Sequence, residues 1–269
     1  MLCGRQVIVV VPAYQEEAHV GLVIQTMPRF VDQIVVVDDG SGDRTSDVVR
    51  ALHEPRAHLV RHHERRGVGA AIATGYERAI GLTSHACDAI AVMAGDAQMA
   101  PADLEGVVGP VVRGEAAYVK GCRFGQPGVK RTMGLPRWLG GQAFSRLTSL
   151  AIGQEISDSQ CGYTALSREA AEELDLSGLW PSFGYPNDLL GQLAARRARI
   201  VEVPVQAVYG TEISKLRLRH LPPIFFLIAR AAVRRSTASP PRPRDIRRNV
   251  TRADDARQKG LRPDSAVSS

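Results

Sequence analysis

Two stretches of sequence decide the fold: Val7-Ile8-Val9-Val10-Val11-Pro12-Ala13 and Ile34-Val35-Val36-Val37-Asp38-Asp39-Gly40. Each begins with a short apolar run rich in β-branched residues, which is typical of a strand buried on both faces. Further runs of this kind occupy 58–60, 89–93, 117–119 and 200–205. Segments with helical spacing separate most of them, at 17–30, 46–53, 69–80 and 101–112. This alternation predicts an α/β fold with a central, mostly parallel sheet flanked by helices.

Acidic residues stand where two of the predicted strands end. Asp38 and Asp39 follow the run at 34–37, and Asp96 and Gln98 follow the run at 89–93. Ligands of open α/β sheets bind outside the carboxyl ends of the strands, so we expect these side chains at one edge of the sheet. Asp38 and Asp39 present acceptors for base N–H or ribose hydroxyl groups, with turn formation and helix capping as the competing roles.

Asp96 and Gln98 carry oxygen atoms, which are the ligands that Mg²⁺ and Mn²⁺ prefer. A divalent cation held there between two phosphates would stabilise the charge on a departing nucleoside diphosphate. Taken alone, an Asp-x-Gln at a strand end is more often a polar turn. A zinc site is not expected, because the four cysteines are scattered and lack a C-x-x-C spacing, which also favours a reducing compartment.

Two other groups of residues have both a functional and a structural interpretation. Pro12, Tyr14 and Glu16 follow the first strand and suit a nucleobase or ribose, but they also suit a proline turn that leads into a helix. Gly67, in Gly-Val-Gly before a helix, allows close approach of a phosphate or ribose, although tight packing explains it as well. We assign no role to His62, since a histidine beside a strand is more often a polar surface residue.

The charge of the chain is concentrated at its C-terminal end. Residues 234–269 contain ten Lys/Arg and four Asp/Glu, so this segment alone carries the net charge of +6. It is rich in Pro and Arg and poor in large apolar residues, which predicts a disordered, basic tail over 236–269. Nucleic-acid binding would rest on this tail alone, and we do not expect it. The 44% hydrophobic content of the chain is ordinary for one globular domain.

The apolar stretch at 221–233 contains Arg230 and two prolines and is shorter than the roughly 20 residues of a spanning helix. The segment 220–235 is therefore interpreted as an amphipathic helix that lies on a membrane, docks on the domain or forms a homodimer contact. Because 7–11 leads straight into Pro-Ala-Tyr-Gln-Glu, we see no secretory signal and expect a cytoplasmic location. Peripheral contact with the inner face of the membrane is compatible with this location.

Four ordered motifs carry a family resemblance: Val10-Val11-Pro12-Ala13-Tyr14-Gln15-Glu16, Val35-Val36-Val37-Asp38-Asp39-Gly40-Ser41, Gly95-Asp96-Ala97-Gln98-Met99-Ala100-Pro101 and Asp158-Ser159-Gln160-Cys161-Gly162-Tyr163. Together they resemble glycosyltransferase family 2, and within it the dolichyl/polyprenyl-phosphate mannosyl- and glucosyltransferase branch. The resemblance implies a GT-A fold over 1–219. It also implies inverting transfer of a sugar from a GDP-mannose or UDP-glucose type donor to a polyprenyl phosphate.

The resemblance also implies roles for individual positions. On the donor side these are Pro12, Tyr14 and Glu16 at the nucleoside, Asp39 at its base or ribose, Asp96 and Gln98 at the metal, and Ser214 and Lys215 with Arg217 or Arg219 at the diphosphate. On the acceptor side they are Arg123 and Arg131 at phosphates and Asp158 at the acceptor or as a base. A phosphate acceptor is already an anion and needs no base, whereas a hydroxyl acceptor needs one, for which Asp158 or Asp188 is the candidate. Asp188 is also explained as an acid at a helix start.

The metal motif departs from the family pattern at one position. The usual pattern is Asp-x-Asp-x-Gln, and here Ala94 occupies the place of the first Asp. Asp96 and Gln98 remain, and one or two protein groups plus phosphates can hold Mg²⁺. The competing hypotheses are the same donor chemistry with a soluble small-molecule acceptor, and a nucleotide-sugar-binding protein without turnover. A nicotinamide oxidoreductase is remote, because the full G-x-G-x-x-G pattern is lacking.

Overall fold

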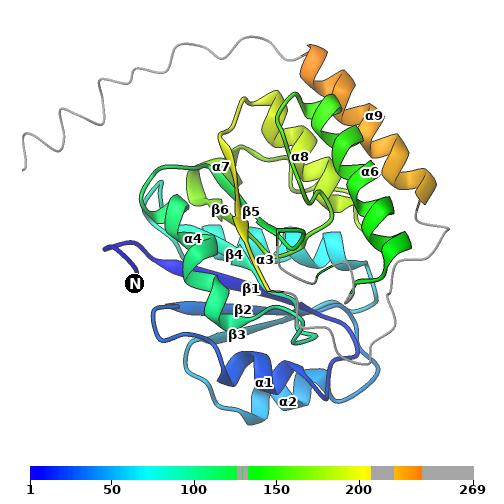
Figure 1. Cartoon of the computed structure of the whole chain (residues 1–269). Coiled ribbons are helices and arrows are strands. Elements are labelled where there is room, and N and C mark those ends of the chain that lie inside the picture. The colour runs from blue at the N-terminus through cyan, green and yellow to red at the C-terminus, as the bar shows by residue number, and fades with distance from the viewer. Residues whose placement is uncertain (126–128, 130–132, 207–220, 238–269) are drawn as a thin grey trace, which may run out of the picture. The chain divides into compact units, whose positions relative to one another are not determined.

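In the computed structural model, which describes residues 1–125, 129, 133–206 and 221–237, seven strands form one sheet. They are β1 (Val7–Ala13), β2 (Gln33–Asp38), β3 (Ala57–Arg61), β4 (Ala89–Val92), β5 (Tyr118–Cys122), β6 (Thr164–Ser167) and β7 (Ile200–Pro204). Their order across the sheet is β3-β2-β1-β4-β6-β5-β7 (Figure 1). The predicted α/β sheet is confirmed, and each of the six apolar runs forms a strand.

β6 is the strand that runs against its neighbours among these seven. It is antiparallel to β4 and β5, whereas the other pairs in the sheet are parallel. The register places Thr164, the first residue of β6, opposite both Val92 and Lys120. The start of β6 therefore lies at the same edge of the sheet as the ends of β1, β2, β4 and β5. Sequence analysis missed β6, because its four residues Thr-Ala-Leu-Ser have no clear apolar periodicity.

Helices cover both faces of this sheet (Figure 1). One face is covered by α1 (Val20–Gln25), α2 (Thr45–Ala51) and α4 (Leu104–Val112), which follows a 3₁₀ turn at Pro101–Asp103. The other face is covered by α3 (Val68–Ile80), α6 (Leu135–Ile152), α7 (Arg168–Glu173), α8 (Tyr185–Ala195) and α9 (Leu221–Thr237). Strand β1 is buried along its whole length, and its alternate residues enter the two cores. This two-sided burial is the reason for its unbroken apolar sequence.

The helix expected over 17–30 is much shorter in the structure, where α1 covers Val20–Gln25. A turn precedes it, because the backbone N–H of His19 donates to the carbonyl of Glu16 at 3.0 Å. Pro28 follows its end and cannot supply the N–H that a further helical turn requires. The short helix leaves 14–19 as a loop at the end of β1.

Helix α9 corresponds to the segment interpreted as amphipathic, and it packs against α6 and α8 within the compact unit Met1–Ala238. Its buried apolar residues are Ile224, Leu227, Ile228 and Ala231. Gly191 of α8 permits the close approach, because a Cβ at that position would lie 2.7 Å from the Cβ of Ala231. Within the described ranges we find no helix that is both long and apolar enough to cross a bilayer. The predicted tail from residue 238 onward lies outside the described residues.

Candidate active site

Backbone hydrogen bonds bring three strand ends together at one edge of the sheet. The N–H of Asp39 donates to the carbonyl of Ala13 at 2.9 Å, which joins the end of β2 to the end of β1. The N–H of Gly95 donates to the carbonyl of Pro12 at 3.1 Å, which joins the segment after β4 to the same place. Pro12, Asp39 and the Asp96 segment therefore lie side by side, as expected for ligand-binding residues of an open α/β sheet.

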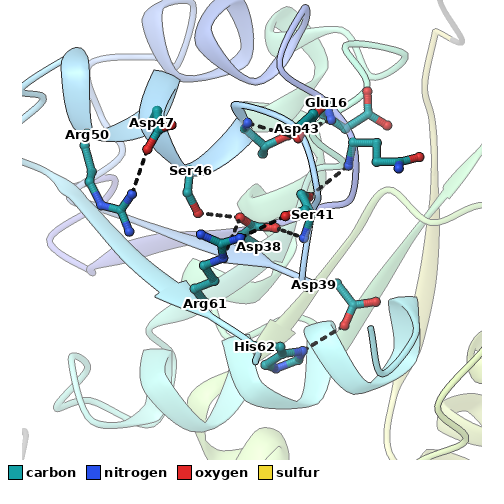
Figure 2. A network of polar contacts seen from close by, with 12 residues as sticks. Glu16, Asp38, Asp39, Ser41, Asp43, Ser46, Asp47, Arg50, Arg61 and His62 are labelled. Carbon is teal, nitrogen blue, oxygen red and sulfur yellow. Dashed lines mark hydrogen bonds and ion pairs between the residues drawn. The ribbon is translucent and has the colours of Figure 1, made fainter. Parts of the chain in front are cut away.

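Asp38 is buried and has a structural role in the loop between β2 and α2 (Figure 2). Its Oδ1 accepts from the backbone N–H of Ser41 at 2.8 Å, and its Oδ2 accepts from the hydroxyl of Ser46. The Nε of Arg61, at the end of β3, lies 3.6 Å from the same Oδ2. These contacts correspond to turn formation, the role that competed with substrate binding for Asp38.

Asp39 links the end of β2 to the loop that precedes α3. Its Oδ1 accepts from Nδ1 of His62 at 2.8 Å (Figure 2). The same Oδ1 accepts from the N–H of Arg66 at 2.8 Å, and Oδ2 accepts from the N–H of Gly67 at 2.7 Å. A carboxylate only accepts, so Nδ1 of His62 carries the proton. The Nε2 of His62 lies 3.0 Å from the hydroxyl of Thr74 on α3. His62, to which we assigned no role from the sequence, is buried and thus orients Asp39 at the sheet edge.

Gly67 and Gly69 lie against the backbone of the segment before α8. The N–H groups of Gly69 and Ala70 donate to the carbonyl of Pro181 at 2.9 and 3.2 Å, which satisfies the start of α3. A Cβ at Gly67 would lie 2.3 Å from the Pro181 oxygen, and one at Gly69 would lie 2.0 Å from the Trp180 oxygen. These contacts agree with the tight-packing interpretation of the glycines. A substrate contact by Gly67 stays a prediction.

Replacing Gly69 with alanine is expected to destabilise the protein by about 1–3 kcal/mol, because the new methyl group overlaps the Trp180 carbonyl. The matched control is Gly106→Ala on α4, another helical glycine, where a Cβ would meet nothing within 4 Å. There the higher helix propensity of alanine should leave stability unchanged or raise it by up to about 1 kcal/mol. Urea unfolding of the two variants measures both effects, and equal shifts would contradict the steric argument.

Two side chains at the end of β1 are held by neighbouring loops. The guanidinium carbon of Arg65 lies 4.2 Å above the centre of the Tyr14 ring, a cation–π arrangement. Glu16 is buried, its Oε2 lies 3.1 Å from Nδ1 of His19, and its N–H donates to the hydroxyl of Thr45 at 2.9 Å. Tyr14 and Glu16 therefore lie near Asp39, and Arg65 is a further cation at this place that the sequence did not single out.

Asp96 and Gln98 flank a residue with a strained backbone. Ala97 has φ +57°, a left-handed conformation that costs a non-glycine residue of the order of 1 kcal/mol and is found preferentially at functional sites. The Oδ1 of Asp96 accepts from the backbone N–H of Gln98 at 3.1 Å. Both residues follow β4 next to Pro12. The tight turn places one carboxylate and one side-chain amide close together at the sheet edge.

Arg123, which is partly exposed, forms an ion pair with the buried Asp158 at the end of β5. The Nε of Arg123 donates to Oδ2 of Asp158 at 2.7 Å, and its Nη2 donates to Oδ1 at 2.9 Å. The backbone N–H of Arg123 adds a third bond at 3.1 Å. Burial opposes ionisation of Asp158, but the hydrogen bonds from Arg123 and the charges of Arg123 and Lys120 outweigh it and lower its pKa. A lowered pKa is the reverse of what a general base near neutral pH requires.

A second layer of contacts holds this pair in place. The backbone N–H groups of Ser157 and Asp158 donate to the carboxylate of Glu202 on β7 at 2.8 and 3.0 Å. The fully buried Lys120 of β5 donates from Nζ to the carbonyl of Cys161 at 2.6 Å, and burial lowers its pKa. The loop from 157 to 161 is therefore fixed to two strands, which keeps Arg123 in position.

The Asp158 loop also meets the Asp96 loop. The hydroxyl of Tyr163 donates to the carbonyl of Ala100 at 3.0 Å, and a Cβ at Gly162 would lie 3.4 Å from Cε of Met99. The segments that carry Asp96 and Arg123 are thus neighbours across the start of β6. The structure brings together the expected donor side, from Pro12 to Gln98, and the described part of the acceptor side.

Asp188 lies at the start of α8 and contacts α9. Its Oδ2 accepts from the backbone N–H of Trp180 at 2.9 Å, and its Oδ1 pairs with Arg234 and, at 3.8 Å, with Arg230. The carboxylate thereby holds α9 against α8, while a base role for it stays a prediction. The other predicted contacts, Arg131, Ser214, Lys215 and Arg217 or Arg219, lie outside the described residues.

A family model described as glycosyl transferase family 2 matches residues 8–175, which is more than half of the chain. The chain belongs to glycosyl transferase family 2. It is a hexosyltransferase, and the family named from the four motifs is confirmed.

Two relatives of this chain have names that specify a lipid-phosphate substrate or product. A UDP-N-acetylglucosamine–dolichyl-phosphate N-acetylglucosaminyltransferase from Methanococcus voltae is 28% identical over 231 residues, which cover 80% of this chain and 90% of the relative. A polyprenol monophosphomannose synthase from Mycolicibacterium smegmatis is 28% identical over 208 residues, which cover 75% and 77%.

The fold of the chain is similar to that of solved glycosyltransferases. Glucosyl-3-phosphoglycerate synthase from Mycobacterium tuberculosis, solved with Mn²⁺, uridine diphosphate and phosphoglyceric acid, gives a TM-score of 0.62 at 23% identity. The match covers 88% of this chain and 80% of the synthase. The GT-A fold expected for a family 2 member is therefore confirmed.

The described residues of the family 2 chain fit a weakly coordinated Mg²⁺ or Mn²⁺ ion. Among them, no group of three or more His, Cys, Asp or Glu side chains could form a metal cage. Asp96 and Gln98 offer oxygen atoms, which suits a hard cation that takes its remaining ligands from water and a diphosphate. Ala94 supplies no ligand at the first position of the motif. A cation bound by Asp96 and Gln98 would therefore take most of its ligands from water and the donor substrate.

Proposed function

We propose that this hexosyltransferase moves a sugar, with inversion, from a GDP-mannose or UDP-glucose type donor to a polyprenyl phosphate. The observation that carries the proposal is the Arg123–Asp158 ion pair, fixed at the same sheet edge as Asp96. The pair presents the guanidinium group of Arg123 where the acceptor is expected. It also keeps the buried carboxylate of Asp158 hydrogen-bonded and ionised. Such a site suits an acceptor that is already an anion and needs no base.

The proposed reaction assigns a role to each of these residues. Tyr14, Glu16 and Asp39 bind the nucleoside, and Asp96 and Gln98 would hold Mg²⁺ or Mn²⁺. The bound cation would stabilise the negative charge on the departing nucleoside diphosphate. Arg123, oriented by Asp158, positions the acceptor phosphate so that one of its oxygens attacks the anomeric carbon. That C–O bond forms as the bond to the diphosphate breaks on the opposite side of the sugar, and no proton is transferred.

The two relatives named above support a lipid phosphate as the acceptor, because their names specify dolichyl phosphate and a polyprenol monophosphate product. The synthase of similar fold was solved with Mn²⁺ and uridine diphosphate, which supports a metal-dependent nucleotide donor. The same synthase was also solved with phosphoglyceric acid, so a soluble acceptor is the second candidate. That acceptor also bears a phosphate, which Arg123 would bind in the same way.

A transfer assay distinguishes these acceptors. The full chain is incubated with GDP- or UDP-hexoses, Mg²⁺ or Mn²⁺, and a short-chain polyprenyl phosphate. We expect one donor to give a sugar lipid and an equal amount of nucleoside diphosphate, and we expect EDTA to stop the reaction. The matched control is the same polyprenol without its phosphate, which should give no product. Transfer only to soluble hydroxyl compounds would show that the acceptor is not a polyprenyl phosphate. Binding of the donor without any turnover would support a non-catalytic protein.

A further inference from the structure

Exposed large apolar side chains gather on two helices. Nine such residues occur in the described part of the chain, and seven of them lie on α6 and α9. These seven are Leu135, Leu139, Leu147, Leu150, Phe225, Phe226 and Val233. The exposed fraction reaches 76% for Leu150 and 58% for Phe226. We call these seven residues the α6–α9 surface. Such a concentration is unlike the scattered apolar residues of an ordinary protein surface and indicates an interaction site.

The two helices lie next to each other, so their exposed residues belong to one surface. α6 and α9 are in contact, and both pack against α8 (Figure 1). The rings of Phe144 on α6 and Phe225 on α9 lie 5.3 Å apart between their centroids. Each helix also contributes a buried side, with Ser145 and Thr148 on α6 and Ile224 and Leu227 on α9. The apolar surface is therefore the outward side of helices that are already docked.

The charges of these helices are of one sign. Neither α6 nor α9 contains Asp or Glu, whereas their sequences include Arg137, Arg146, Arg230, Arg234 and Arg235. Arg146 and Arg235 are exposed, while Arg230 and Arg234 pair with Asp188. The sequence after α9 adds eight basic and four acidic residues over 239–269. Apolar side chains accompanied by basic ones suit the interface of a bilayer that contains anionic lipid.

A second copy of the chain fits this surface less well. A symmetric dimer would place the same patch of both subunits face to face. Arg146 and Arg235 of each copy would then face a patch whose helices carry no acidic residue to pair with them. Burying such charges without partners is unfavourable. A bilayer lets the same arginines reach lipid phosphates while the leucines and phenylalanines enter the acyl region.

The α6–α9 surface is connected to the candidate acceptor site. Phe124 directly follows Arg123 and packs at Gly141 of α6, where a Cβ would lie 2.6 Å from the ring atom Cζ. The guanidinium carbon of Arg123 lies 6.0 Å from the centre of the Phe124 ring. α6 thus runs from the neighbourhood of Arg123 into the apolar surface. A membrane bound there would lie beside the group proposed to hold a lipid phosphate.

We propose that the α6–α9 surface docks the protein on a bilayer that contains anionic phospholipid. The two helices lie in the interface, with their leucine and phenylalanine side chains inserted and Arg146 and Arg235 at the phosphates. Docking follows from α6 and α9 alone, while its use in presenting the acceptor to Arg123 rests on the proposed function.

Vesicle flotation tests the proposal with phosphatidylcholine vesicles that contain or lack phosphatidylglycerol. The full chain should float with the mixed vesicles and bind the neutral ones more weakly. Partition of the protein from water into the mixed vesicles should fall about tenfold or more for each of three single substitutions, Leu147→Asp and Leu150→Asp on α6 and Phe226→Asp on α9. Each of them removes one inserted apolar side chain. The matched control is Leu22→Asp on α1, which changes a 55% exposed leucine far from this surface and should bind like the unchanged protein (Figure 1).

Transfer assays and light scattering complete the test. Each substituted residue is exposed, so the thermal midpoint should stay unchanged. Transfer to a short-chain acceptor in solution should also persist, while transfer to a long-chain acceptor in vesicles falls with binding. Flotation without transfer to any acceptor supports docking and counts against the proposed function only. Absent flotation of the unchanged protein overturns docking. Docking is also overturned if light scattering shows a dimer that the Leu147→Asp and Leu150→Asp substitutions dissociate while vesicle binding stays unchanged.

Discussion

Asp96→Ala is expected to lower the rate of hexose transfer at least about 100-fold, because stabilisation of a departing diphosphate by a held cation contributes several kcal/mol. The loss should be large because Ala94 offers no replacement ligand, which leaves Gln98 as the remaining side chain of the motif. The tight turn at Ala97 also depends on the hydrogen bond from Gln98 to Asp96. Initial rates of nucleoside diphosphate release over a range of Mn²⁺ concentrations measure the effect.

Two comparisons make the Asp96 result specific. Glu105→Gln removes an exposed carboxylate from α4 and should leave both the rate and its Mn²⁺ dependence unchanged. Asp96→Asn keeps the shape and one oxygen, so it should retain some activity and need more Mn²⁺ for half-maximal rate. If Asp96→Ala transferred hexose at the normal rate, the assignment of the cation to this turn would be wrong.

Arg123→Ala is expected to lower the free energy of unfolding by about 3–5 kcal/mol at neutral pH, because it leaves the charge of Asp158 buried without its partner. The double variant Arg123→Ala/Asp158→Ala should recover much of this loss, since it removes both charges. Arg113→Ala is the matched control. Arg113 makes an equally short two-bond pair with Glu115 at the surface, and breaking that pair should have no measurable effect. Urea unfolding of the three variants provides the measurement.

The effect of Arg123→Ala should depend on pH. The pKa of Asp158 is lowered in the folded protein, so ionised Asp158 contributes stability above its unfolded pKa of about 3.8. This contribution disappears as the pH falls through the folded pKa. In the variant, burial is no longer outweighed by Arg123, and the pKa of Asp158 rises. The stability difference between the two proteins should therefore shrink as the pH falls below about 5. A constant difference across that range would mean that Arg123 stabilises the fold by packing alone.

The strands and the positions of the acidic residues were predictable because they depend on neighbours in the sequence. Unbroken β-branched runs such as Val7 to Val11 favour a strand that is buried on both faces. The carboxyl ends of parallel strands meet at one edge, so the places of Asp39 and Asp96 followed from the predicted sheet. β6 was missed, because a four-residue strand with two polar residues has no periodicity to recognise. Its antiparallel direction sets how the Asp158 loop meets the Asp96 loop.

The pairings within the site were not predictable, because they join residues that are distant in the chain. His62 lies 23 residues from Asp39, and Arg123 lies 35 residues from Asp158. The sequence alone determined an α/β sheet with acidic strand ends and an apolar C-terminal helix, because strand formation and helix periodicity are local. Only the tertiary structure decided which side chains bind one another and that α9 lies beside α6. Strand order and helix packing bring those partners together, and neither is encoded in the spacing of residues along one segment.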